Sequence, residues 1–129
     1  MNTIESVHKK IVAGEISIKD LVASYVEKSK ADTFNIYREV FTDIDEQVAR
    51  AEKMLVEGKA TALTGIPVVI KDNIMFAGHI AGACSKMLEH YTASFDSTAV
   101  AALKEAGAII IGRTNMDDGA MGASTENSA

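Results

Sequence analysis

The sequence predicts an α/β protein in which helices cover both faces of a sheet. Two short apolar runs, 66–70 and 108–111, are typical of strands, and both are continuous rather than alternating. A continuous apolar run favours a strand whose two faces are both buried. A helical pattern lies between the two runs, and the order strand, helix, strand is that of a unit with parallel strands.

Two helices are expected first. Thr3 and Ser17 can each cap one, because a hydroxyl oxygen at this position accepts a hydrogen bond from a free N–H of the first turn. The apolar stripe of the first helix consists of Ile4, Val7 and Ile11. The stripe of the second consists of Ile18, Leu21, Val22, Tyr25 and Val26.

Residues 36–42 alternate loosely and predict a further strand, and Asp45 can cap a third helix that ends at Gly58. After the 66–70 strand, residues 75–94 predict a long irregular connection with one short helix.

Asp96 can cap a helix that Gly107 closes. Residues 112–129, which follow the second apolar run, predict mostly loop.

A length of 129 residues fits one domain or part of a larger one. We divide this single domain into a helical N-terminal portion, about 1–60, and a strand–helix–strand portion, about 61–129. The chain ends in the polar stretch "STENSA", which is neither a helix nor a strand. We therefore expect a fragment of a longer native protein.

The composition argues against several classes of function. The net charge is −5 with no basic block, so the segment is not expected to bind nucleic acid directly, although contact with RNA through a partner stays open. A single cysteine, Cys84, cannot form an intramolecular disulfide, which favours a reducing compartment such as the cytoplasm. No apolar run approaches the ~18–20 residues of a membrane span, so no membrane association is expected.

Metal and thiol chemistry are not expected either. His79 and His90 lack the neighbouring ligands of a metal site, and no metal is predicted. Cys84 has no visible activating histidine, so it is interpreted as a structural thiol.

Lys71 is the first candidate for chemistry. It directly follows the 66–70 strand, and Arg113 follows the 108–111 strand after one glycine, Gly112. If the strands are parallel, both emerge at the carboxyl edge of the sheet, where ligands bind in open α/β folds. Partial burial would lower the pKa of such a lysine, which could then act as a general base or activate a serine. The alternative is that Lys71 only forms a salt bridge with Asp72 or a neighbour.

Three segments, "LTGIPVVIKDNI" (63–74), "LKEAGAIIIGRTNMDD" (103–118) and "AMGASTENSA" (120–129), resemble the amidase signature family. Together with "AGEISIKDLVASYVEKS" (13–29), they look most like the branch formed by the A subunits of glutamyl-tRNA(Gln) amidotransferases. The resemblance implies that the chain is the N-terminal portion of the amidase-signature fold, with a mixed sheet and helices on both faces.

The resemblance also implies site residues. Lys71 matches the family's catalytic lysine, which works with a nucleophilic serine and a bridging serine in a cis peptide. Both serines follow "STENSA" in the family, so this chain is expected to be inactive alone. Met121 and Gly122 fall where relatives line the substrate pocket, and the resemblance makes Met121, Gly122, Ser124 and Thr125 candidates for substrate binding. For Ser124 the alternative is hydrogen bonding within the loop. Gly119 stands where relatives usually have a bulky aromatic, which puts the local pocket in doubt.

By resemblance, the parent protein hydrolyses glutamine and supplies ammonia that converts Glu-tRNA(Gln) to Gln-tRNA(Gln). Its partners would be the B and C subunits, giving a heterotrimer. The tRNA, ATP and Mg²⁺ would bind on the B subunit, with no cofactor in this chain. Two alternatives stay open: a stand-alone hydrolase of small amides, and a non-catalytic α/β interaction module.

Overall fold

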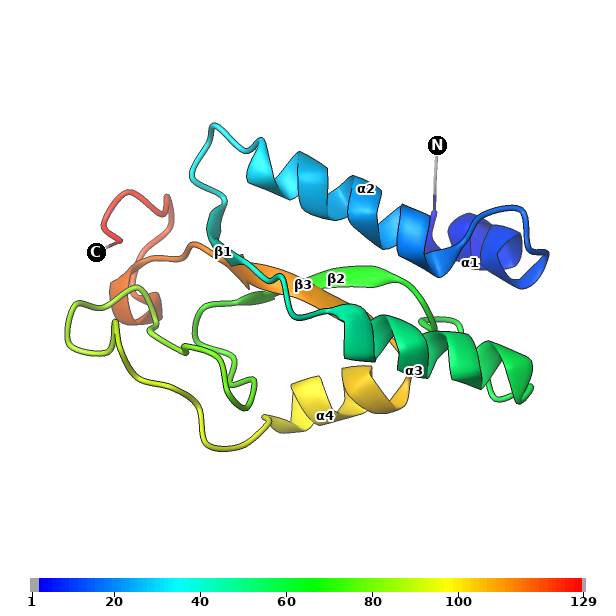
Figure 1. Ribbon diagram of the computed structural model, residues 1–129. Helices are drawn as coiled ribbons and strands as arrows, with labels where there is room; N and C mark the ends of the chain where they lie inside the picture. Colours follow the sequence, from blue (N-terminus) through cyan, green and yellow to red (C-terminus); the bar gives the residue numbers. More distant parts are fainter. Residues whose placement is uncertain (1–2, 129) are drawn as a thin grey trace.

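The computed structural model describes residues 3–128, and the elements of this part follow the α/β order (Figure 1). The elements are α1 (Ile4–Val12), α2 (Ile18–Lys30), β1 (Tyr37–Val40), α3 (Asp45–Val56), β2 (Pro67–Lys71), α4 (Thr98–Glu105), β3 (Ile109–Thr114) and the short 3₁₀-helix η1 (Asp118–Ala120). None of the helices in this part is long and apolar enough to span a bilayer.

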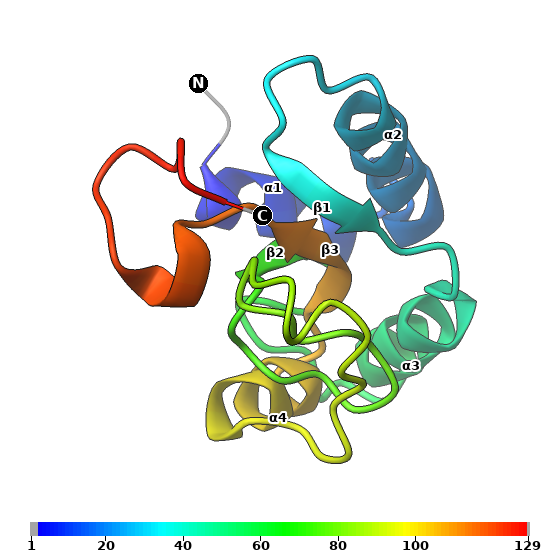
Figure 2. The ribbon, with the colours of Figure 1, turned by 90° about the vertical axis from the view of Figure 1, so that its left-hand side faces the viewer.

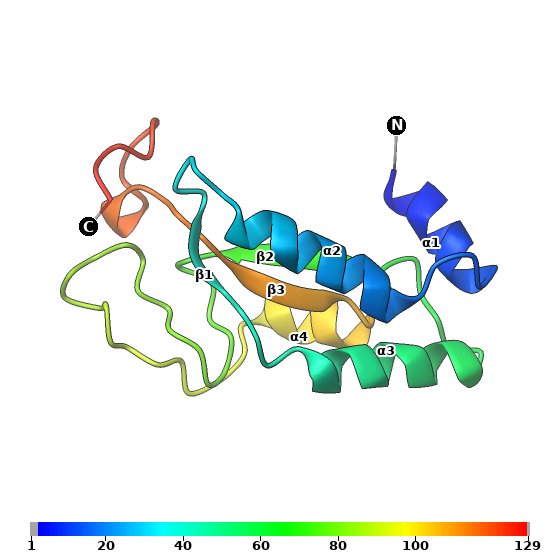
Figure 3. The ribbon, with the colours of Figure 1, turned by 45° about the horizontal axis from the view of Figure 1, so that its top comes forward.

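The three strands form one mixed sheet in the order β1-β3-β2. β2 and β3 are parallel and are joined through α4, as the strand–helix–strand pattern predicts, while β1 is antiparallel to β3. The carboxyl ends of β2 and β3 therefore lie at the same edge. The long connection after β2 and the C-terminal segment gather at this edge (Figure 3).

Helices cover both faces of the sheet, as the sequence predicts, and Figure 1 shows α2 and α4 on opposite sides of it. Figure 2 views the same arrangement from the side of the carboxyl edge. Successive residues of β3 supply both cores, because neighbouring side chains of a strand point to opposite faces. Ile109 and Ile111 pack with residues of α1, α2 and α3, whereas Ile110 packs with Val100 of α4 and with Phe41.

The first two predicted caps are confirmed. Thr3 accepts a hydrogen bond from the Ser6 backbone N–H, and the Ser6 hydroxyl bonds back in a capping box. Ser17 accepts from the backbone N–H of Asp20.

The other two predicted caps are wrong. Ile44 holds the cap position of α3 without a side-chain bond, so Asp45 is already helical. At α4 the cap is Ser97, which accepts from Val100. Asp96 instead accepts a hydrogen bond from the Ala77 backbone and pairs with Lys104.

The two central strands differ from the sequence prediction. β3 continues to Thr114 and is buried along almost its whole length, so Arg113 lies on the strand rather than beyond it. β2 lies at the edge of this sheet and is less buried than its apolar sequence suggests, with Val69 40% exposed. Residues 75–94 form turns and an isolated bridge between Ile80 and Thr92, and the short helix predicted there is not present.

Candidate functional site

Lys71 and Thr114 lie side by side at the carboxyl edge of the sheet. They are the last residues of β2 and β3 and are register partners in the parallel pair, so their side chains share one face. Lys71 is exposed, which corrects the partial burial expected from the sequence. Among residues 3–128 its amino group makes no hydrogen bond or ion pair. Lys71 is thus free to meet a group that approaches from solvent or from another segment.

Asp72 is not the ion-pair partner of Lys71, so that alternative is wrong. The Asp72 carboxylate is 1% exposed and pairs with Arg113 on β3. Its second oxygen accepts a hydrogen bond of 2.7 Å from the backbone N–H of Cys84. Both carboxylate oxygens are therefore occupied on the face of β2 opposite to Lys71.

Arg113 connects all three elements at this edge. Besides pairing with Asp72 of the β2 end, its Nε donates to a carboxylate oxygen of Glu39 on β1, at 2.9 Å. Burial acts to lower the pKa of Arg113, but its hydrogen bonds to Glu39 and Asp72 outweigh that effect and raise the pKa. We call Glu39, Asp72 and Arg113 the edge ion cluster. Sequence reasoning placed Arg113 at this edge but missed its pairing with Glu39 and Asp72, because both carboxylates are distant from Arg113 along the chain.

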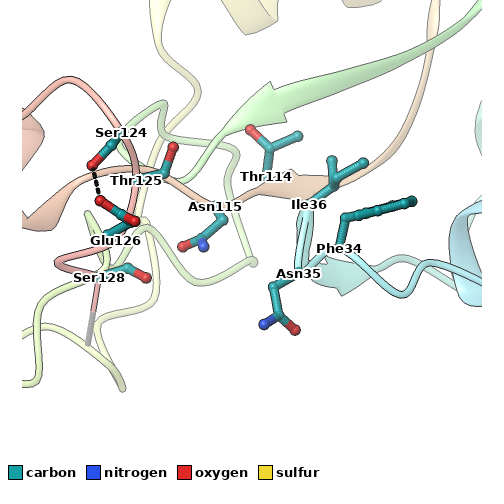
Figure 4. Close-up of a pocket in the computed structure, with 9 residues that line it drawn as sticks. All are labelled: Phe34, Asn35, Ile36, Thr114, Asn115, Ser124, Thr125, Glu126 and Ser128. Carbon is teal, nitrogen blue, oxygen red and sulfur yellow. Dashed lines mark hydrogen bonds between the residues drawn. The ribbon is translucent and has the colours of Figure 1, made fainter.

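A groove of about 580 Å³ opens beside Thr114 (Figure 4). One wall is the loop before β1, the other is the C-terminal segment, and β3 ends between them. The lining residues are Phe34, Asn35, Ile36, Thr114, Asn115, Ser124, Thr125, Glu126 and Ser128. Most of this lining is polar, which suits a ligand that exchanges hydrogen bonds.

The predicted pocket residues divide into two pairs. Ser124 and Thr125 line the groove, whereas Met121 and Gly122 do not, and the Met121 side chain is 79% exposed. The Ser124 hydroxyl donates to Glu126 at 2.8 Å (Figure 4). Gly122 lies against Asp117, where a Cβ atom would overlap the carboxylate.

Asp117 also fixes the segment by accepting a hydrogen bond from the Thr125 backbone, at 2.8 Å. Gly119 has a φ of +58° and open space where a Cβ would lie. A larger side chain at this position would therefore meet backbone strain rather than a filled pocket.

Cys84 is buried below the edge, as its structural interpretation predicts. Its thiol donates to the side-chain oxygen of Asn115 at 3.2 Å. Burial is the main cause that raises the pKa of this thiol, which disfavours the nucleophilic thiolate. Within residues 3–128, no three His, Cys, Asp or Glu side chains gather in a way that could hold a metal ion.

Comparison with known sequences relates the chain to one protein family. Residues 20–129 match the family described as Amidase. Similar curated proteins include the A subunit of the glutamyl-tRNA(Gln) amidotransferase of Desulforapulum autotrophicum, 36% identical over 98% of this chain. The corresponding subunit of Caldanaerobacter subterraneus is 40% identical over 97% of this chain. The chain spans 26% and 25% of these relatives, about a quarter of their length.

Solved structures give the same fold. The native peptide amidase from Stenotrophomonas maltophilia superposes with a TM-score of 0.82 at 25% identity, covering 91% of this chain and 25% of the amidase. The A subunit of the glutamyl-tRNA(Gln) amidotransferase from Thermotoga maritima superposes with a TM-score of 0.64 at 28% identity, over 88% of this chain and 26% of that subunit.

Proposed function

The chain belongs to the amidase family, and from that premise we propose that it is part of the glutamine-hydrolysing A subunit of a glutamyl-tRNA(Gln) amidotransferase. The observation that carries the proposal is Lys71, which ends β2 with an exposed amino group that has no partner among residues 3–128. Curated relatives that are 36–40% identical to the chain bear that subunit's name.

In the proposed reaction Lys71 moves a proton. Its amine accepts a proton from a bridging serine, which in turn takes the proton of a nucleophilic serine as that oxygen attacks the glutamine carboxamide. The C–N bond breaks, and the proton returns along the same path to the departing ammonia. Water then hydrolyses the acyl-enzyme to glutamate. Both serines would come from the part of the protein beyond this chain, so we expect residues 1–129 alone to be inactive.

The polar groove beside Thr114 supports a site for a small polar amide at the same edge. We propose that Ser124 and Thr125 contact glutamine there, and that Met121 and Gly122 act through the conformation of the segment. The B and C subunits would be partners in a heterotrimer, and Glu-tRNA(Gln), ATP and Mg²⁺ would bind on the B subunit. Cys84 is a free thiol, which suits the reducing cytoplasm as the compartment.

The test is glutamine hydrolysis by the full-length protein with its partner subunits. Lys71→Ala should abolish ammonia release, because no other described residue at the strand end offers an unpaired amine. Lys19→Ala is a matched control, since Lys19 is also exposed but lies in the first turn of α2, far from the carboxyl edge of the sheet. Full activity of Lys71→Ala would contradict the proposal.

A stand-alone hydrolase of small amides is the second candidate. It is favoured by the closer superposition on the peptide amidase than on the Thermotoga maritima subunit, with TM-scores of 0.82 and 0.64. Turnover of aryl or alkyl amides without partner subunits would support it. An interaction module, the third possibility, predicts no amide hydrolysis with or without partners.

A further inference from the structure

A change of register in β3 determines which residue lies beside Lys71. Val68 pairs with Ile110, but two residues later Ile70 pairs with Arg113, so β3 uses three residues where β2 uses two. Such a bulge shifts every following side chain to the other face. With a regular register, Arg113 would be the partner of Lys71. With the bulge, the partner is Thr114.

Gly112 lies within the bulged stretch of β3, where the backbone of β1 approaches closely. A Cβ atom at this position would lie 2.5 Å from the backbone oxygen of Glu39, closer than packed atoms approach. The close approach of β1 to β3 therefore requires glycine. It also brings Glu39 into register with Arg113, so that both side chains share the face occupied by Asp72.

The bulge thus separates two cations that a regular sheet would place together. Arg113 lies under the edge and is neutralised by Asp72 and Glu39, while Lys71 lies on the opposite face beside an uncharged threonine. A lysine next to a second cation would repel it, and a lysine paired with a carboxylate would be held away from a reaction partner. The observed arrangement avoids both.

Asp72 also fixes the backbone that carries Lys71. Its N–H donates to the Thr114 carbonyl at 3.2 Å, and its own carbonyl accepts from Ala83 at 3.1 Å. Its carboxylate bonds to Arg113 and to the Cys84 N–H. Four bonds to two other segments therefore hold the residue that directly follows Lys71.

We propose that the Asp72–Arg113 ion pair, which depends on the bulge in β3, is a positioning element for the Lys71 amine in amide hydrolysis. The inference rests on the proposed function. Neither residue contacts the substrate: both act by holding the β2 end and by leaving Lys71 unpaired.

The experiment measures glutaminase kinetics of the full-length protein with its partners for Asp72→Asn, Arg113→Gln and the double variant. We expect each single variant to lower kcat about 100-fold with little change in KM for glutamine, because a shift of the amine near 1 Å costs about that factor. The double variant leaves only the Glu39 carboxylate without its partner, and because that side chain is 42% exposed, the double variant should fold even if a single variant does not. Its kcat should remain low.

Lys104→Met is the matched control, because it breaks the 2.6 Å ion pair with Asp96, which is at the start of α4 and not part of the edge ion cluster. It should lower the melting temperature without changing kcat. The positioning role would be overturned if a single variant that folds, or the double variant, had the same kcat as the wild type. Failure of the proposed function would give a different result. Either the wild-type complex would release no ammonia, or the Lys71→Ala complex would release ammonia as fast as the wild-type complex.

Discussion

Asp72 and Arg113 form a buried ion pair that joins the ends of β2 and β3 at the edge where Lys71 meets Thr114. The Asp72 side chain is 1% exposed and the Arg113 side chain 10%. A buried pair adds little net stability over an apolar pair, but the loss of one partner leaves a charge without compensation. The pair is therefore a point where stability and site geometry depend on the same two side chains.

Replacing one partner of this pair should be costly. We expect Arg113→Gln to lower the free energy of unfolding of the full-length protein by about 3–5 kcal/mol, because Asp72 stays buried without its cation. The measurement is denaturant unfolding at neutral pH. Lys59→Gln, which removes the exposed pair with Glu57, is the control and should cost about 0–1 kcal/mol. Equal effects of the two variants would show that the edge pair is solvated in solution.

Gly112→Ala should destabilise the protein through steric overlap. Its Cβ would lie 2.5 Å from the Glu39 oxygen, so β1 must move away from β3, at a cost of about 1–3 kcal/mol. Gly58→Ala is a useful comparison, because Gly58 has a φ of +68° but open space around it, so strain alone costs about 1 kcal/mol there. Thermal unfolding should rank Gly112→Ala as the more destabilised variant, and the reverse order would argue against the tight β1–β3 contact.

The sequence predicted the parts of the fold that depend on local pattern. Apolar periodicity and hydroxyl caps predicted α1 and α2, and the two continuous apolar runs correspond to β2 and β3. The cap at Asp45 was wrong by one position, because α3 already begins at that residue. The cap at Asp96 was wrong because its carboxylate has other partners. Asp96 is used by the Ala77 backbone and by Lys104, which are distant in sequence.

The candidate site was predictable only in its position. The polar residues after an apolar strand predicted Lys71 at the carboxyl edge, and the structure has it there. Its exposure was not predicted, and its separation from Arg113 depends on a bulge in the pairing of β3 with β2, two segments that are distant along the chain. A local sequence pattern does not predict how segments that are far apart in the sequence pair with each other. The same holds for the groove, whose walls come from segments distant along the chain.

Cys84 should react slowly with thiol reagents in the folded protein. It is 1% exposed, and burial, the main cause, raises the pKa of its thiol, so both access and the thiolate fraction are low. The measurement is the rate of iodoacetamide labelling at pH about 8, followed by intact mass, with and without denaturant. Denaturant should accelerate labelling strongly. A native rate equal to the denatured rate would contradict the burial of Cys84.

The Asp96–Lys104 pair should give the protein part of its acid sensitivity. Burial acts to raise the pKa of Asp96, but hydrogen bonds from Lys104 and the Ala77 backbone outweigh it, and the pKa falls below the ordinary 3.8. A group whose pKa is lowered on folding contributes stability above its unfolded value, and that contribution is lost as the pH falls through the folded value.

Lys104→Met removes the main cause that lowers the Asp96 pKa, so the variant should be less stable than wild type near pH 6. The difference should shrink below pH about 4, as Asp96 is protonated in both proteins. The measurement is the free energy of unfolding against pH. Lys9→Met is the control, because its exposed pair with Glu5 should have almost no effect at either pH. A difference between Lys104→Met and wild type that stayed constant down to pH about 2 would mean that Lys104 stabilises α4 through its contact with the Phe76 ring rather than through Asp96.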